Sequence, residues 1–252
     1  MLPINVFILC HNEIVLLPHT VAHYKKYMPS CMITICDNES TDGSVELAKS
    51  LGCNVITFST NNIFDEVRGV YQKNNCWKYL TSGWVLTPDM DEWLCVTEAE
   101  LNSEFLKGTT ILNVHGYDMV GNSETADLSD VDLHGITNKI YNDFESKRLC
   151  FLRDEISEMN HGVGCHRSSP IGNIKYSSDV YINKHMRYPG LQFLINKLKV
   201  RYERTEDMRK KGWGHHYTND ISRIETEYKE AVRKVTIRYY NFQPKLSFLT
   251  RF

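Results

Sequence analysis

Two aspartates separated by one residue are the feature of the sequence that most directly suggests chemistry. Asp89 and Asp91 closely follow the apolar run 84–87, and Glu92 and Trp93 come next. Side chains at positions i and i+2 of an extended chain point to the same side, so the two carboxylates can share one divalent cation, or divide a cation and a ribose hydroxyl between them. We therefore predict a cation-binding strand end here, although an Asp-x-Asp pair taken alone also suits a solvated loop.

Polar residues also follow two earlier apolar runs, 6–10 and 32–36. After the first run come His11, Asn12 and Glu13, and after the second comes Asp37, at the start of a stretch rich in Asn, Ser, Thr, Asp and Gly. Such residues favour turns and helix caps wherever they occur, so the second stretch also suits an ordinary turn. In an open α/β sheet, however, ligands bind at the carboxyl ends of the strands, and the three polar groups are predicted to converge on one rim.

The spacing of apolar residues over the first hundred positions predicts the elements that would place these groups. Four short apolar runs are predicted strands: 6–10, 32–36, 55–58 and 84–87. Helical patterns lie between them, and in the first of these Leu17, Val21 and Tyr24 recur at steps of three and four residues. Alternating strands and helices are typical of an α/β fold with a mostly parallel central sheet flanked by helices, which is the fold we predict.

The second half of the sequence is less regular. A strand is predicted over 110–114, with 116–119 following it. The polar stretch 121–146 has no clear assignment, which suits a loop over the site or an excursion that binds an acceptor. Three segments follow towards the C-terminus: a helix with many basic residues over 191–211, a charged helix over 220–234, and a β-rich or irregular tail over 235–252.

Composition excludes some classes of function. The chain has 252 residues, 42% of them hydrophobic, which is enough for one sizeable domain. Its formal charge of -2 leaves no basic excess for binding along a nucleic-acid backbone, so no nucleic acid is expected as a partner. The eight cysteines are scattered without paired spacing, which indicates buried free thiols in a reducing compartment. Because no basic leader and no bilayer-length apolar stretch is visible, we predict no transmembrane segment and a cytoplasmic location.

The polar segments described above resemble, in their order and spacing, family 2 glycosyltransferases of the GT-A fold, and in particular the branch whose motif reads Asp-x-Asp-Glu-aromatic. Similar domains occur in bacterial surface-glycan enzymes and in large DNA viruses. Further segments that resemble this branch are 71–78, 116–119, Gly164-Cys165-His166 with Pro170 and Gly172, and 212–217.

The resemblance covers about residues 4–217 of the chain. It implies a GT-A domain over 1–217, in which 1–100 is the nucleotide-binding half and 101–217 the acceptor-facing half. Residues 218–252 would form a helical or irregular extension.

A metal-dependent, inverting transfer is what the resemblance implies, from a nucleotide-diphospho-sugar donor, with a UDP-sugar favoured, to a hydroxyl of a glycan or another acceptor. Asp37 would accept a hydrogen bond from the nucleobase. The residues expected to line the donor pocket with it are His11, Asn12, Glu13, Asp65, Lys73 and Asp89. Lys73 would face the diphosphate, with Arg68 as a further cation nearby, although a lysine on a helix is as often a solvated surface residue.

The same resemblance implies a Mn²⁺ or Mg²⁺ ion on the aspartate pair, which would stabilise the charge of the leaving diphosphate. Asp91 is the main expected ligand, and Asp89 would bind directly or through water. Two histidines could add an imidazole ligand: His185, in a short strand-like segment, and His166, after the glycine turn. Met186 stands where the family has an aromatic residue, and a lone histidine is more often a packed or surface residue.

Inversion requires a general base that takes the proton of the acceptor hydroxyl. Asp118, Asp154 and Glu155 are the candidates, and the sequence does not choose between them. Trp93 and Trp213 are candidates to stack on a sugar ring, although tryptophan is more often part of the core.

Two other functions fit parts of the sequence. A nucleotidyltransferase also places carboxylates and a metal at a sheet edge, but it would be expected to begin with a glycine-rich, basic phosphate loop, and residues 11–13 are neither. A non-catalytic module of the same fold that binds a nucleotide or a glycan stays open, because the general base is unassigned.

Overall fold

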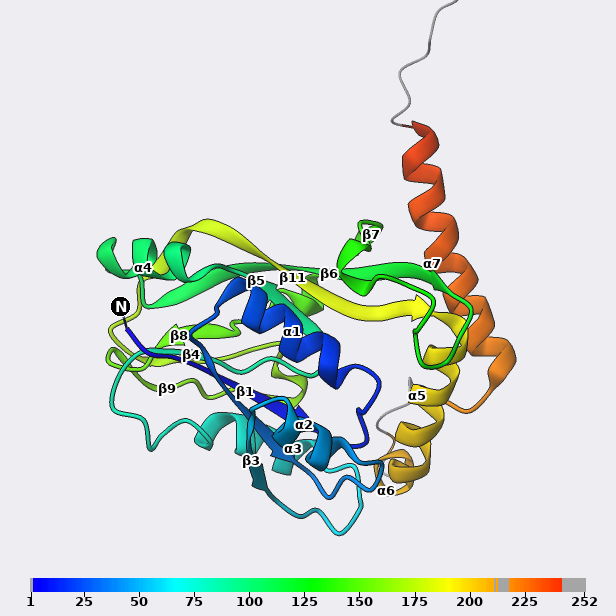
Figure 1. Ribbon diagram of the computed structural model, residues 1–252, viewed down its shortest axis with the longest axis horizontal. Helices are drawn as coiled ribbons and strands as arrows, with labels where there is room; N and C mark the ends of the chain where they lie inside the picture. The colour runs from blue at the N-terminus through cyan, green and yellow to red at the C-terminus, as the bar shows by residue number, and fades with distance from the viewer. Residues whose placement is uncertain (1, 211, 213–217, 242–252) are drawn as a thin grey trace, which may run out of the picture.

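One nine-stranded sheet runs through the computed structural model, which describes residues 2–210, 212 and 218–241, and 237–241 by their backbone alone. The strand order is β3-β2-β1-β4-β8-β6-β11-β5, with β7 paired to β6, while β9 and β10 form a separate two-stranded sheet (Figure 1). The strands are β1 (Ile4–Cys10), β2 (Met32–Asp37), β3 (Asn54–Thr57), β4 (Trp84–Leu86), β5 (Glu92–Cys95), β6 (Ile111–Ser123), β7 (Lys139–Tyr141), β8 (Cys150–Leu152), β9 (Ile156–Glu158), β10 (Ile171–Gly172) and β11 (Tyr176–Gly190). The helices are α1 (Leu17–Tyr27), α2 (Ser44–Ser50), α3 (Glu66–Asn75), α4 (Glu98–Leu106), α5 (Leu191–Arg204), α6 (Glu206–Lys210) and α7 (Ile221–Asn241), with 3-10 turns η1 (Leu133–Gly135), η2 (Asp143–Glu145) and η3 (Val163–Cys165).

Strands β1 to β4 are all parallel to one another. Alternate residues of β1 belong to two different cores: Val6 and Ile8 share one with Tyr24 of α1, and Phe7 shares the other with Trp77, just after α3. Because successive side chains of a strand point to opposite faces, a strand covered by helices on both faces is apolar throughout. The structure confirms the predicted α/β architecture, a mostly parallel central sheet flanked by helices.

The order of the strands reverses between β1 and β4. β1 is followed by β2 and β3 on one side of the sheet and has β4 on its other side. Leu9, near the end of β1, forms a parallel bridge with Asp89, beyond the end of β4. The loops after these strands therefore meet at a topological switch point, the place where open α/β sheets bind ligands.

Two long parallel strands, β6 and β11, carry the second half of the sheet. β6 is one strand of 13 residues, where the sequence predicted a strand over 110–114 with a separate segment after it. β11 has 15 residues, so His185 lies in a long strand and not in a short segment. β5 runs antiparallel to β11 directly after the aspartate pair, and the register places His185 beside Glu92 on one side and Asp118 on the other.

The remaining segments differ from the sequence prediction in three places. The unassigned stretch 121–146 contains the end of β6, strand β7, and the turns η1 and η2. The predicted helix over 191–211 breaks at Thr205 into α5 and α6. Helix α7 continues to the last described residue, so the prediction of a β-rich or irregular tail is wrong for 235–241, and residues 242–252 lie outside the described part.

Helix α7 packs against the last residues of β6 and β11 through one apolar stripe. Ile224, Ala231 and Val235 share a buried cluster with Val120 of β6 and Leu194 of α5. The far end of the helix extends beyond the sheet (Figure 1).

Cysteines and membrane spans were the subject of two further predictions. All eight cysteines are free and seven of them are buried, which confirms the prediction of buried free thiols except for the half-buried Cys95. In the part of the chain that the structure describes, no helix combines the length and the apolar character needed to cross a bilayer.

Candidate active site

The loops after β1 and β2 are tied together by short hydrogen bonds. The backbone N–H of Asn12 donates to Ser40 Oγ at 2.9 Å, and that of Glu13 donates to Ser44 Oγ at 3.1 Å. His11 Nδ1 lies 2.6 Å from the carbonyl oxygen of Asn38. The polar stretch after β2 is therefore both a turn and half of a rigid rim at the carboxyl end of the sheet.

Asp37 is the last residue of β2 and is 2% exposed. Its Oδ2 accepts a hydrogen bond from the backbone N–H of Ser40 at 3.2 Å. Its Oδ1 is buried, and no described residue donates to it. A buried acceptor without a donor costs about 1–3 kcal/mol, so this oxygen is a position suited to a donor supplied by a ligand.

The carboxylate of Asp89 is held by two buried lysines. Lys73 Nζ, from α3, lies 2.7 Å from Asp89 Oδ1, and Lys147 Nζ lies 3.5 Å from Oδ2. Burial acts to raise the pKa of the Asp89 carboxyl, but the two ammonium groups outweigh it and hold that pKa well below its usual range. Lys73 is 3% exposed, so it is not the solvated surface residue that was the alternative.

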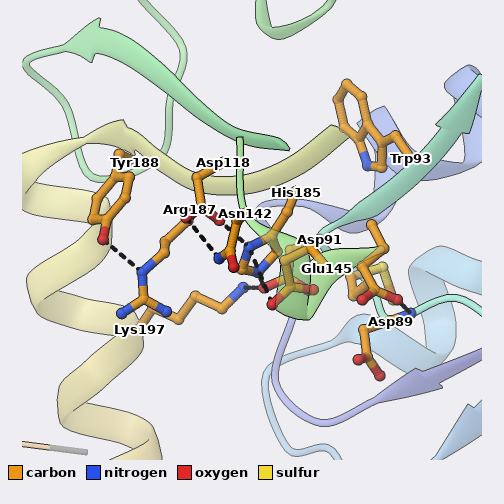
Figure 2. A network of polar contacts seen from close by, with 12 residues as sticks. Asp89, Asp91, Trp93, Asp118, Asn142, Glu145, His185, Arg187, Tyr188 and Lys197 are labelled. Carbon is orange, nitrogen blue, oxygen red and sulfur yellow. Dashed lines mark hydrogen bonds and ion pairs between the residues drawn. The ribbon is translucent and has the colours of Figure 1, made fainter. Parts of the chain in front are cut away.

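Asp91 is almost completely buried, 4% exposed, beneath side chains from two other elements. Its Oδ2 accepts a hydrogen bond from Lys197 Nζ at 2.8 Å and lies 3.4 Å from His185 Nε2 (Figure 2). Arg201 Nη2 lies 3.7 Å from the same oxygen, and Lys197 and Arg201 also face Glu13 at 3.7 and 3.8 Å. Burial acts to raise the pKa of Asp91, but Lys197 and His185 outweigh it and lower that pKa strongly.

His185 is fixed between two carboxylates. Its Nδ1 lies 2.7 Å from Asp118 Oδ1, while Asp118 Oδ2 accepts a hydrogen bond from Asn142 Nδ2 at 2.9 Å. Burial acts to lower the pKa of His185, but Asp91 and Asp118 outweigh it and raise that pKa to about 10. The imidazole is thus a cation in this state. Once deprotonated at Nε2, it would have the arrangement typical of a metal-binding histidine, whose other ring nitrogen donates to a carboxylate.

Three buried charged residues beside Asp89 complete the network. Lys147 Nζ lies 2.6 Å from Glu92 Oε1 and 3.1 Å from Glu145 Oε2. Glu145 ends η2, and burial raises its pKa to about 7. Sequence analysis missed the roles of Glu145, Lys147, Lys197 and Arg201, because no motif or spacing distinguishes them from surface charges.

Two of the three carboxylates predicted as general base are not brought to this rim. Asp154 Oδ2 accepts a hydrogen bond from the backbone N–H of Gly83, which precedes β4, whereas Asp89 follows β4. Glu155 Oε2 accepts from Asn173 Nδ2 on the same side of the molecule as Asp154. Asp118 alone among the three contacts a partner of Asp91.

Three other predicted residues have contacts away from the network. Asp65 caps α3, since its Oδ1 accepts from the backbone N–H of Arg68 at 3.0 Å. His166 is exposed, and its Nδ1 lies 2.7 Å from the carbonyl oxygen of Phe144. Trp93 is fully buried, so it cannot stack on a sugar. Trp213, the second tryptophan predicted to stack, lies outside the described residues.

No three His, Cys, Asp or Glu side chains of the described residues are arranged to hold a metal ion by themselves. The four predicted ligands therefore do not form a complete cage: Asp91 and His185 face each other, Asp89 is paired with lysines, and His166 lies apart. Asp91 and His185, with Asp118 behind the imidazole, fit a cation whose remaining ligands come from a bound molecule or water.

Comparison with known proteins gave structural similarity only. No family model and no curated protein matches the sequence. Staphylococcus aureus TarS has a TM-score of 0.43 at 13% identity over 98% of this chain and 45% of its own, and TarS 1–349 in complex with UDP-GlcNAc has a TM-score of 0.41 at 12% identity, over 98% and 75%.

Glucosyl-3-phosphoglycerate synthase from Mycobacterium tuberculosis, in complex with Mn²⁺, UDP and glucosyl-3-phosphoglycerate, has a TM-score of 0.31 at 16% identity. The match covers 46% of this chain and 44% of the synthase. This chain thus spans less than half the length of the synthase and of full TarS. All these TM-scores lie below 0.5.

Proposed function

We propose that the chain is a metal-dependent, inverting glycosyltransferase of the GT-A type, which transfers a sugar from a UDP-sugar to a hydroxyl of a glycan or another acceptor. The observation that carries the proposal is the convergence of Asp37, Asp89 and Asp91 on the rim where β1, β2 and β4 end. Asp37 is far from the other two in the sequence, and Asp37 and Asp91 are buried while Asp89 keeps 36% of its side chain exposed. A fold without a ligand at this rim has no reason to gather these three carboxylates there.

Asp37 offers an acceptor to the base of a uridine nucleotide. The N3–H of uracil is a donor, and the buried, unpaired Oδ1 of Asp37 is an acceptor. His11, Asn12 and Glu13 belong to the loop next to it and line the same pocket in this proposal.

Asp91 and His185 are proposed to hold the divalent cation, with Asp118 as the residue that orients the imidazole. An imidazole ligand favours Mn²⁺ over Mg²⁺. The cation would stabilise the negative charge of the departing diphosphate. With His185 neutral as a metal ligand, the carboxylates of the site outnumber its lysine and arginine side chains, and this excess of negative charge suits a divalent cation: Glu13, Asp89, Asp91, Glu92, Asp118 and Glu145 against Lys73, Lys147, Lys197 and Arg201.

Glu145 is the proposed general base. Asp118 uses both of its oxygens in hydrogen bonds with His185 and Asn142, whereas Glu145 Oε2 lies beside Lys147 and Glu92 and accepts no hydrogen bond from the described residues. In the proposed reaction, the acceptor oxygen forms a bond to the anomeric carbon while its proton passes to Glu145. The bond from that carbon to the diphosphate oxygen breaks, and the configuration inverts.

The proposal is tested by measuring release of UDP from a panel of UDP-sugars, with and without Mn²⁺, for wild type and Asp91→Ala. We expect Asp91→Ala to lower the Mn²⁺-dependent rate at least about a hundredfold, the usual effect of removing one group that stabilises a developing anion. Asp179→Ala is the matched control, because Asp179 is exposed. It lies near the start of β11 and pairs with Lys107, which follows α4. Equal rates in wild type and Asp91→Ala would remove the role assigned to the cation site.

A further inference from the structure

Helix α5 places two cationic side chains beside the carboxylates of Asp91 and Glu13. Lys197 and Arg201 are four residues apart and therefore lie on the same face of the helix. Leu194 and Leu198, on the neighbouring face, belong to the buried cluster with α7 and β6. The apolar face anchors α5, and this anchoring directs the two cationic side chains over the rim.

The two cations cover Asp91 and Glu13. Lys197 Nζ lies 2.8 Å from Asp91 Oδ2, and the three other distances among these four side chains are 3.7 to 3.8 Å. The side chain of Asp91 is 6% exposed and that of Lys197 10%, whereas Arg201 keeps 31% of its side chain exposed. A cation or an anion from solution can thus reach Asp91 only when Lys197 moves away from it.

A purely structural ion pair explains this arrangement poorly. Burying charged groups at a strand end costs several kcal/mol per ion, so a structural role alone gains little over apolar packing. The pair also stands at the switch point, where the loops after β1 and β4 meet. The two cationic side chains, Lys197 and Arg201, differ in chemistry as a phosphate site would require. Lysine is a compact point charge, and the planar guanidinium of arginine can bind two phosphate oxygens at once.

We propose that Lys197 and Arg201 bind the diphosphate of the donor, and that in the ligand-free chain they take the place of the divalent cation beside Asp91. The inference rests on the proposed function and adds to it the residues that recognise the diphosphate. When a divalent cation binds at Asp91, like-charge repulsion drives the ammonium of Lys197 off the carboxylate, and the diphosphate oxygens accept it.

This exchange predicts that one substitution changes the affinities for Mn²⁺ and for UDP in opposite directions. In Lys197→Met the site loses one competitor for Asp91, so the protein without nucleotide binds Mn²⁺ more tightly. The same change removes a donor to the diphosphate, so UDP binds more weakly to the protein saturated with Mn²⁺. Substitution of a residue with only a structural role would weaken the binding of both ligands or of neither.

The experiment is isothermal titration calorimetry on the full chain, with UDP at saturating Mn²⁺ and with Mn²⁺ alone. For Lys197→Met we expect about tenfold weaker UDP binding and about tenfold tighter Mn²⁺ binding, in line with one charge removed from a partly buried pair. Lys199→Met is the matched control, because Lys199 is exposed on the same helix, and it should change neither affinity. Lys197→Arg keeps the charge and should retain UDP binding, which also guards against a Met variant that folds poorly.

Each alternative result has a distinct meaning. If wild type binds UDP and Lys197→Met binds it equally well, the diphosphate role is overturned. If Mn²⁺ binding is unchanged or weaker in a folded Lys197→Met protein, the exchange at Asp91 is overturned. A wild-type chain that binds UDP neither with nor without Mn²⁺ would overturn the proposed function itself, and this inference with it.

Discussion

Two aspartates of one turn show how individual atoms separate a structural role from a binding role. Asp42 uses both oxygens locally, because Oδ2 accepts from the backbone N–H of Ile14 and Oδ1 from that of Ser44, at the start of α2. Asp37 uses one oxygen in the same kind of bond and keeps the other buried and unpaired. The sequence could suggest this difference only through position, since Asp37 ends a strand and Asp42 precedes a helix.

Asp37→Asn tests the nucleotide pocket at this scale. The asparagine can still accept from Ser40, but its NH₂ group would face the N3–H donor of uracil, and two donors cannot pair. We expect UDP binding in the presence of Mn²⁺ to weaken at least about tenfold, because a site built to accept a hydrogen bond loses affinity when its polar groups are left unpaired. The stability measured by urea unfolding should change by less than about 1 kcal/mol.

Asp42→Asn is the control for this pair, since its NH₂ group would face one of the two backbone donors, which should destabilise the fold by roughly 1 kcal/mol while UDP binding stays near wild type. Loss of UDP binding in both variants alike would show that the turn as a whole, and not the unpaired oxygen, determines affinity.

At the scale of elements, one glycine sets how closely η2 approaches β6. A Cβ on Gly116 would lie 2.1 to 2.4 Å from backbone and side-chain atoms of Glu145, far inside van der Waals contact. The motif 116–119 noticed in the sequence therefore contains a packing requirement: only glycine lets the turn that carries Glu145 lie against the strand that carries Asp118.

Gly116→Ala should push η2 away from β6 and displace Glu145. We expect the transfer rate to fall at least about tenfold, because displacements near 1 Å at a catalytic group have effects of this size or larger, while UDP binding changes less than about threefold. The rate and the affinity are measured separately on the same protein. Gly69→Ala in α3 is the control, since its Cβ would meet only Leu9 Cδ1 at an ordinary 3.6 Å. A Gly116→Ala enzyme with the wild-type rate would argue against Glu145 as the base.

The sequence predicted those elements whose signals are local. Strands β1 to β4 and the polar residues at their ends follow from apolar runs and turn residues only a few positions apart. The pairing of His185 with Asp118 depends on the register of β6 and β11 across 67 positions, and no short-range pattern encodes it. The roles of Lys147 and Lys197 were not predicted for the same reason, because tertiary packing determines their partners.

The prediction of a β-rich or irregular tail is wrong for 235–241 for a related reason. Val235 and Thr236 are β-branched and favour strands, but Val235 packs into the cluster beneath α7. Packing there outweighs the intrinsic preference, and the helix continues.

At the scale of the whole molecule, α7 belongs to the predicted extension and packs against the predicted transferase domain. Ile224 is 1% exposed and lies in the cluster with α5 and β6. We expect Ile224→Ala to lower the free energy of unfolding by about 2–5 kcal/mol, the usual range for a buried isoleucine. Far-ultraviolet circular dichroism and tryptophan fluorescence should report one shared urea transition for the variant as for wild type.

Ile221→Ala is the control for this packing, because Ile221 is exposed on the same helix, and its effect should be within about 0.5 kcal/mol. A separate early transition, confined to the helical signal and present in wild type, would show that residues 218–241 unfold independently and would favour two units.

Acid stability is a property of the whole molecule to which the buried His23 contributes. His23 is 2% exposed, with Nε2 at 3.0 Å from the carbonyl oxygen of Leu94 and its ring stacked on Trp93. Burial lowers the pKa of His23 to about 4, although the hydrogen bond to Leu94 acts to raise it. The neutral imidazole is therefore part of the folded state at pH 7.

The sign of the pH effect follows from this shift. Above pH 6.5 neither state binds the proton and stability is unaffected, whereas between pH 6.5 and 4 the unfolded chain binds a proton that the folded chain excludes. Stability should thus fall as the pH falls, with His23 contributing roughly 2 kcal/mol of the loss between pH 7 and pH 5. In His23→Gln the amide can still donate to Leu94 but does not titrate, so urea unfolding at the two pH values should give a difference smaller by about that amount. Other histidines titrate equally in both proteins and cancel in the comparison; an unchanged difference would mean that His23 is protonated in the folded state.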